Sequence, residues 1–115
     1  MISDTTDYEL QLLLSLDGYE FRLASDYRIK FEACTVTATR GRPKGVKYSL
    51  TLHDPAGRRI YGIDNAHRTG RRQEFDHRHV QGGLKVIDYS YRGPVALLED
   101  FYREAERILR GRGEI

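Results

Sequence analysis

The densest group of reactive side chains in the sequence lies between residues 67 and 79. Seven of these thirteen residues are histidine or arginine, against two carboxylates, Glu74 and Asp76. The group ends with a His-x-His pair, His77 and His79. If residues 76–80 form a strand, both rings project from the same face, because side chains alternate along a strand. Two imidazole rings could then act on one ligand.

Imidazole and guanidinium groups together could cleave RNA without a metal ion. Imidazole exchanges protons near neutral pH, and guanidinium pairs with phosphate oxygens. One histidine would deprotonate a ribose 2′-hydroxyl, a second would protonate the leaving 5′-oxygen, and arginine would stabilise the charge on phosphorus. Asp64 or Asp76 would orient an imidazole. We therefore predict no cofactor, catalytic residues Asp64, His67, His77 and His79, and RNA-binding residues Arg68, Arg71, Arg72 and Arg78.

Other interpretations of these residues remain open. The His-x-His pair with Asp64 is also a two-histidine, one-carboxylate set that suits a metal ion. The basic segment could bind nucleic acid or a protein without any turnover. Asp64-Asn65 could form a turn that caps a strand end through side-chain to backbone hydrogen bonds. We expect His53 to be a turn residue with its ring in solvent.

The positive charge is concentrated in the middle of the chain. Residues 1–39 carry three Lys/Arg against seven Asp/Glu, residues 40–92 carry twelve against five, and residues 93–115 carry four against five. The three segments therefore have net charges of −4, +7 and −1, which sum to the overall +2. A basic centre between acidic ends is expected of a protein that binds phosphate-rich ligands through one region, and equally of a solvated arginine-rich surface.

Composition excludes several classes of protein. A chain of 115 residues with 39% hydrophobic and 31% charged residues fits one globular domain, which we assign to residues 1–115. The aliphatic run at residues 12–14 is far too short for a bilayer, so we expect no membrane segment. Cys34 is the single cysteine, which excludes an internal disulfide. With no secretion signal at the start, we expect a cytoplasmic protein.

The first segment has two competing interpretations. Thr6 followed by Glu9 has the capping-box spacing, leucines then recur at helical intervals, and Gly18 would supply the left-handed stop. This pattern favours a short N-terminal helix. Alternating leucines over residues 10–16 with a hairpin at Asp17-Gly18 would instead form a strand and turn.

The rest of the chain predicts an α+β fold, an antiparallel meander covered by a C-terminal amphipathic helix. Period-two patterns and short turns indicate strands over residues 26–63, with a β-bulge near Ala33 and Cys34 where the parity changes. Residues 64–83 are predicted to be a basic, histidine-rich loop, and residues 84–92 a further strand. Proline and a three-to-four-residue apolar spacing predict a helix over residues 94–110.

The sequence between about Tyr27 and Leu109 resembles the TumE-like toxin family of toxin–antitoxin systems. The resemblance rests on the segments at residues 47–50, 54–57, 60–67 and 75–80, and on Leu97-Leu98-Glu99-Asp100-Phe101 with Glu104 and Glu106. It implies an intracellular toxin neutralised by a helix-turn-helix antitoxin encoded beside it, and a homodimer is left open. The positions that match the family pattern are Asp64, Asn65, His67, His77, Arg78 and His79.

Overall fold

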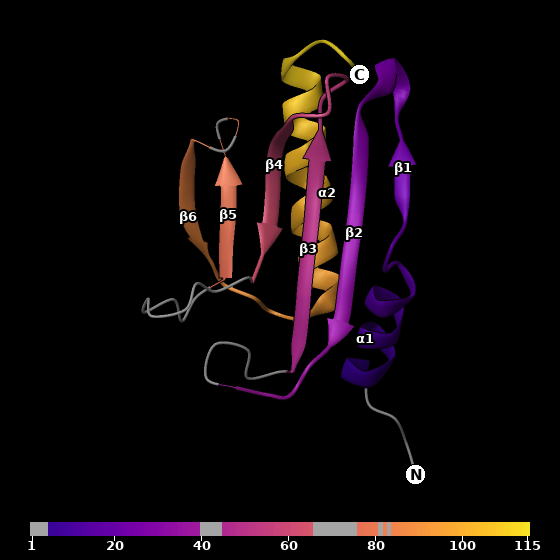
Figure 1. Ribbon diagram of the computed structural model, residues 1–115, viewed down its shortest axis with the longest axis vertical. Helices are drawn as coiled ribbons and strands as arrows, with labels where there is room; N and C mark the ends of the chain where they lie inside the picture. The colour runs from indigo at the N-terminus through magenta and orange to yellow at the C-terminus, as the bar shows by residue number, and fades with distance from the viewer. Residues whose placement is uncertain (1–4, 40–44, 66–75, 81, 83) are drawn as a thin grey trace.

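Six strands form one antiparallel sheet whose spatial order is the same as the chain order. The computed structural model describes residues 5–39, 45–65, 76–80, 82 and 84–115 (Figure 1). The strands are β1 Glu20–Arg22, β2 Arg28–Thr35, β3 Val46–His53, β4 Arg59–Asp64, β5 Asp76–Val80 and β6 Lys85–Tyr89. Two α-helices, α1 Thr5–Ser15 and α2 Pro94–Gly111, and a short 3-10 turn at Ala24–Asp26 complete the described elements. The predicted α+β meander with a C-terminal helix is confirmed.

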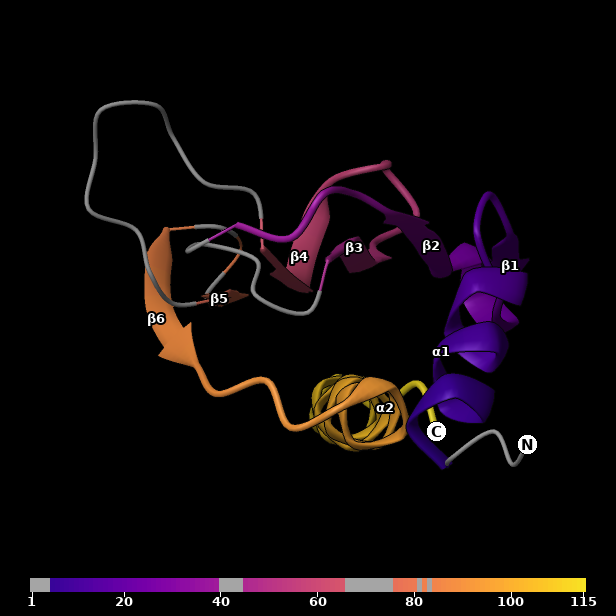
Figure 2. The same ribbon diagram turned by 90° about the horizontal axis from the view of Figure 1, so that it is seen from below.

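Helix α2 covers one face of the sheet, and the sheet curls around it (Figure 2). The helix begins at Pro94 after Gly93, whose φ of 120° is a conformation that side-chain-bearing residues rarely adopt. Proline fits the first helical position because its missing N–H has no partner there. The buried stripe consists of Leu97, Leu98, Phe101, Ala105 and Leu109. The apolar spacing therefore predicted both the helix and the face that it buries.

Alternation along the strands separates a helix-facing side of the sheet from an open side. On β2, Ile29, Phe31 and Ala33 are buried while Lys30 and Glu32 are exposed. Phe31 pairs with Leu50 of β3, and Leu50 pairs with Ile63 of β4, so paired residues continue the same side across the sheet. Hydrophobic side chains thus fill the space under α2, and polar side chains occupy the open face.

Aromatic rings join the helix to the sheet. The ring of Phe101 on α2 stacks on Tyr61 with centroids 5.7 Å apart, and meets Phe31 edge-on at 6.2 Å. Phe101 has no exposed surface, and Phe31 and Tyr61 are each 1% exposed. Such contacts stabilise a pair by about 0.5–1.5 kcal/mol beyond the area they bury. They fix the position of α2 under β2 and β4.

The N-terminal segment is helical, so the alternative of a strand over residues 10–16 is wrong. Leu13 of α1 is completely buried, and Gly18 has a φ of 83°, as expected for the left-handed stop. Asp17 then accepts a hydrogen bond from the backbone N–H of Ala33 at 2.9 Å, which ties the end of this segment to β2. Strand β1, which the sequence analysis did not predict, follows directly.

The predicted bulge at Ala33 and Cys34 is wrong. Pairing between β2 and β3 is continuous through both residues, and the change of polarity arises because β2 ends at Thr35. The irregularity lies instead in the β3–β4 pair, between Leu52 and His53. It directly precedes the hairpin turn at residues 54–57, where the strand must reverse.

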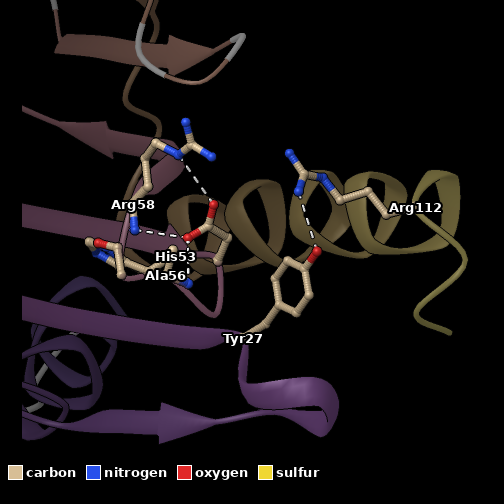
Figure 3. Close-up of polar contacts among 7 residues, drawn as sticks. Tyr27, His53, Ala56, Arg58 and Arg112 are labelled. Carbon is tan, nitrogen blue, oxygen red and sulfur yellow. Dashed lines mark hydrogen bonds and ion pairs between the residues drawn. The ribbon is translucent and has the colours of Figure 1, made fainter.

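The turn after β3 holds His53 more firmly than expected. Asp54 accepts hydrogen bonds from the backbone N–H groups of Arg58 at 2.9 Å and Ala56 at 3.0 Å, and both donors are labelled in Figure 3. These contacts, with that from Arg58 the largest, lower the pKa of Asp54. The ring of His53 lies 2.9 Å from the Thr51 hydroxyl through Nε2. His53 ends β3 and its side chain is half-buried, so the expectation of a turn residue with its ring in solvent is only partly correct. Figure 3 also shows Arg112, after α2, donating to the Tyr27 hydroxyl at 3.3 Å.

The stretch predicted to be a loop over residues 64–83 is not a loop throughout. Asp64 is the last residue of β4, and β5 occupies Asp76–Val80. A short strand of histidines, arginine and aspartate has little apolar alternation, so its pattern was interpreted as a polar connection. Its extended conformation is set by pairing with β4 on one side and β6 on the other.

Candidate active site

A row of polar side chains crosses the open face of the sheet. The strand register aligns Glu32 with Ser49, Ser49 with Asp64, Asp64 with His77, and His77 with Asp88. Each residue belongs to a different strand, from β2 to β6. Directly opposed residues have Cβ atoms about 4.5–5.5 Å apart, so neighbours in this row can interact. The sheet therefore brings together groups that are separated by up to 56 positions in the sequence.

Asp64 and His79 are in direct contact on this face. Nε2 of His79 lies 2.8 Å from Oδ2 of Asp64, and the two side chains are 18% and 11% exposed. Because an ionised carboxylate only accepts hydrogen bonds, Nε2 of His79 carries the proton in this contact. In the neutral tautomer that donates through Nε2, Nδ1 is the acceptor atom. Of the two carboxylates that the sequence analysis considered, Asp64 is the one in contact with His79, and its orienting role stays a prediction.

His77 shares the open face with His79. It lies opposite Asp64 in the register, while His79 lies opposite Gly62. Two residues along a strand span roughly 6.6–6.8 Å. His77 is 8% exposed and Asp64 is 7% exposed, so both are largely shielded from solvent. The expected same-face arrangement of the two histidines is therefore present, with Asp64 beside them.

Asn65 has a role in positioning β4. Its amide accepts a hydrogen bond from the Tyr48 backbone N–H at 2.9 Å and donates one to the Val46 carbonyl at 2.6 Å. The side chain thereby continues the pairing with β3 beyond the last residue of β4. Asn65 is 3% exposed, so these bonds are shielded from water. This is the strand-end hydrogen bonding that was one interpretation of Asp64-Asn65, and it fixes the backbone that carries Asp64.

Arg78 does not join the histidines. It pairs with Ile63 and Ile87 on the helix-facing side, where its guanidinium lies 5.4 Å from the centre of the Tyr89 ring. Asp76 is on this side too and accepts a hydrogen bond from the Tyr48 hydroxyl. Burial, followed by the contact with Asp76, strongly raises the pKa of Tyr48. A phosphate contact by Arg78 remains a prediction, and it would not be made on the face that carries His77 and His79.

The sequence analysis did not propose the cations of the open face as RNA-binding residues. Lys30 and Lys47 alternate with helix-facing residues of β2 and β3, and both are exposed. Arg59 pairs with His53, and its Cδ lies 3.7 Å from the point that a Cβ on Gly62 would occupy. Gly62 is the residue opposite His79, so the Arg59 stem passes close to the Asp64–His79 pair. Alternation along the strands predicts the face on which these cations lie, but the sequence analysis considered only the arginines between residues 67 and 79 as RNA-binding residues.

A cavity of about 390 Å³ opens on the same face beside Asp64. Its walls come from the segment after α1 and from β2, β3 and β4. The lining residues are Asp17, Glu32, Ala33, Cys34, Lys47, Tyr48, Ser49 and Asp64. Binding pockets for small molecules have volumes of about 300–1,000 Å³. The cavity is therefore large enough for one nucleotide-sized group next to the Asp64–His79 pair.

The remaining predicted residues, His67, Arg68, Arg71 and Arg72, lie outside the part of the chain that the structure describes. Within that part, no three His, Cys, Asp or Glu side chains are placed to hold a metal ion together. Asp64, His77 and His79 thus do not form the two-histidine, one-carboxylate arrangement considered above. Among the described helices, none is long and apolar enough to cross a membrane.

The sequence of the chain was compared with those of known protein families. The sequence pattern of the family described as Toxin TumE matches residues 4–109. The chain belongs to the TumE toxin family. The match includes α1, so it extends beyond the resemblance found from Tyr27 to Leu109. TumE toxins are the toxin components of toxin–antitoxin systems, so membership implies an antitoxin partner. No curated protein and no solved structure matches this chain.

Proposed function

We propose that this TumE family toxin acts on RNA by a metal-independent cleavage in which His79 and His77 transfer protons. The observation that carries the proposal is the 2.8 Å contact between Asp64 and His79, with His77 on the same face. A carboxylate that holds one imidazole nitrogen leaves the other nitrogen as a proton acceptor and stabilises the imidazolium that then forms. This pairing serves a general base.

In the proposed reaction, Nδ1 of His79 removes the proton from a ribose 2′-hydroxyl. The 2′-oxygen attacks the adjacent phosphorus, the bond from phosphorus to the 5′-oxygen breaks, and His77 in its protonated form donates a proton to that oxygen. The products are a 2′,3′-cyclic phosphate and a free 5′-hydroxyl. The roughly 6.6–6.8 Å between the two residues along β5 leaves room for the reacting phosphate between the rings.

The cations of the open face would hold the RNA backbone. Lys30 and Lys47 are exposed on β2 and β3, and the stem of Arg59 crosses Gly62 beside His79. Positive side chains on one face attract a polyanion and neutralise phosphates along its path. A guanidinium near the reacting phosphate also stabilises the charge that develops in the transition state. Arg68, Arg71 and Arg72 remain predicted RNA contacts in addition to these three.

Growth arrest after induction in bacterial cells tests the proposal. His77→Ala and His79→Ala should each abolish the arrest, since a positioned general acid or base contributes about 10²–10⁴-fold to the rate. His53→Ala is the matched control because it removes a third imidazole from the same face and should leave the protein toxic. Circular dichroism should show the same fold in all three variants. If His77→Ala and His79→Ala remain as toxic as the parent, the assignment is wrong.

Product analysis separates cleavage from binding. Purified protein with a labelled oligonucleotide should yield a 2′,3′-cyclic phosphate in the presence of EDTA, and loss of cleavage on chelation would instead favour a metal-dependent hydrolase. The exposed cations favour one alternative, a binding module that holds nucleic acid without turnover. In that case the oligonucleotide stays full length, and Lys47→Glu weakens salt-sensitive binding more than His79→Ala does.

We also propose that the antitoxin is a helix-turn-helix protein encoded beside this chain. The family membership supports an antitoxin, and the more specific class is our expectation. Sequencing the adjacent reading frame and co-expressing its product tests the proposal. Relief of growth arrest by a small helix-turn-helix protein would support it, and relief by a neighbour of another fold would contradict it.

A further inference from the structure

We propose that the cavity beside Asp64 is a base pocket that selects guanine, and that Glu32 recognises the base. The inference rests on the proposed action on RNA and adds the identity of the nucleotide. Its basis is the position of the cavity, which shares Asp64 with the Asp64–His79 pair and extends from there across β3 to β2. A nucleotide whose phosphate is held at the histidines would therefore place its base over β3 and β2.

The strand register sets the distance that the nucleotide must cover. Glu32, Ser49 and Asp64 lie on three neighbouring strands in one row. Adjacent strands are about 4.8 Å apart, so Glu32 lies roughly 10 Å from Asp64 across the sheet. A nucleotide spans a comparable distance from its phosphate to the far edge of its base. Glu32 is thus placed to meet the edge of the base when the phosphate lies beside His79.

Glu32 is the carboxylate in the cavity that remains available for a ligand. Asp17 uses Oδ1 to accept the Ala33 backbone N–H at 2.9 Å, and Asp64 is paired with His79. The Glu32 side chain is exposed at the cavity wall. Lys47, also in the lining, would contact a neighbouring phosphate of the RNA strand. Ser49, between Glu32 and Asp64, provides a hydroxyl at the level of the ribose.

The chemistry of a carboxylate selects one base. An ionised carboxylate has two adjacent acceptor oxygens and no donor. Guanine presents two adjacent donors, N1–H and N2–H₂, on its Watson–Crick edge, so both oxygens of Glu32 can be used at once. Adenine, cytosine and uracil each place an acceptor beside the donor, which would face a carboxylate oxygen and repel it. Recognition of unpaired bases through this edge is typical of proteins that bind single-stranded RNA.

The first experiment measures cleavage of oligouridine strands that contain one internal guanosine, adenosine or cytidine. The parent protein should cleave next to guanosine about 5- to 150-fold faster than next to the other bases, the discrimination expected of one bidentate pair. Glu32→Gln should lose this preference by slowing cleavage next to guanosine, while cleavage next to uridine should not fall, because the amide no longer repels the acceptor atoms of uracil. Glu20→Gln is the matched control, since it makes the same change on the neighbouring strand β1, and it should keep the preference.

The second experiment distinguishes failure of the pocket from failure of the proposed cleavage. Binding of 3′-GMP and 3′-AMP to the full chain is measured by calorimetry, which needs no turnover. Tighter binding of 3′-GMP that is lost in Glu32→Gln supports the pocket even if no RNA is cleaved, in which case the proposed cleavage is wrong. Cleavage without any preference for guanosine, or a preference that survives in Glu32→Gln, overturns the pocket and leaves the cleavage in place.

Discussion

The two faces of the sheet are made from alternating residues of the same strands, yet their side chains have different tasks. The helix-facing side carries Phe31, Leu50 and Tyr61, which pack around Phe101 of α2. The open side carries Asp64 and His79 in direct contact. Since neighbouring residues of a strand point in opposite directions, one residue packs in the core and the next lies on the face that carries the candidate site. Each face can therefore be altered while the other is kept.

Strand β5 shows the contrast within five residues. Asp76 and Arg78 contact Tyr48 and Tyr89 on the helix-facing side. His77 and His79 lie on the open side with Asp64. Polar residues alone thus do not define a site, because two of the four polar side chains in this strand serve the packing of the sheet. The following variants test how far the two faces are independent.

The largest effect on folding is expected for Phe101→Ala. Phe101 is completely buried between the rings of Phe31 and Tyr61. Removing a buried phenylalanine side chain typically costs about 3–5 kcal/mol of unfolding free energy. Urea unfolding followed by circular dichroism measures this loss. Tyr102→Ala, at a neighbouring position that is 45% exposed, should cost clearly less. Equal losses would contradict the assignment of Phe101 to the centre of the core.

Asp64→Asn should affect the open face without unfolding the protein. Asparagine has nearly the same shape but cannot stabilise an imidazolium at His79 by charge. We expect RNA cleavage to fall, by less than the about 10²–10⁴-fold that a general base itself contributes. The pH dependence of the cleavage rate should change as well. Asp88→Asn, in the same row beyond His77, is the control and should keep most of the activity. Full activity in Asp64→Asn would show that Asp64 has no role in the proposed cleavage.

Gly62→Ala should affect both faces at once. A Cβ at this position would lie 3.1 Å from the Leu50 carbonyl oxygen and from Cγ2 of Thr51, which is tighter than ordinary contact. Strands β3 and β4 must then move apart, and overpacking of this kind costs about 1–3 kcal/mol. Gly62 lies opposite His79, so cleavage should fall together with the melting temperature. Gly111→Ala, with no atom near the added methyl group, should not lower stability.

The smallest effect is expected for Asp100, which contributes to the dependence of folding stability on acid pH. Burial is the largest single influence and raises the pKa of Asp100, but hydrogen bonds from Tyr89 and Arg92 together hold it below the ordinary value of 3.8. A depressed folded pKa stabilises the protein above the unfolded pKa, and this contribution is lost as the pH falls through the folded value.

In Asp100→Asn, the stability of the fold should therefore fall less steeply as the pH decreases. The effect should be less than about 1 kcal/mol, because the Arg92 and Arg103 partners are exposed and screened by solvent. Thermal melting from pH 6 down to pH 2 measures it, with Glu99→Gln on the exposed side of α2 for comparison. If the melting temperature of Asp100→Asn falls with pH as it does in the parent protein, Asp100 does not contribute to the acid dependence of stability.

Local patterns were sufficient to predict most elements of the fold. The apolar spacing of Leu98, Phe101 and Ala105 identified α2, and the alternation of Ile29 with Lys30 identified β2, because each signal lies within one element. The same alternation placed His77 and His79 on one face. Asp64 and Asp76 were the two candidates for orienting an imidazole, and the structure places Asp64 in contact with His79.

The missing parts depend on pairing between distant segments. The register that aligns Glu32, Ser49 and Asp64 is set by the lengths of the turns, and no single segment contains it. For the same reason the cavity beside Lys47 and Asp64 was missed. The bulge was assigned to Cys34 because a change of polarity at a strand end resembles an inserted residue. The actual irregularity, next to His53, arises from the geometry of the hairpin.

The alternation in β5 also determines which changes of chain length the protein can tolerate. A deletion of one residue before His77 would turn both imidazole rings toward α2 and place Arg78 beside Asp64 on the outer surface. The deletion would disrupt both the core packing and the candidate site, whereas a substitution on one face leaves the other face intact. Length variation among natural members of the family should therefore be confined to the turns, and the spacing within the strands should stay constant.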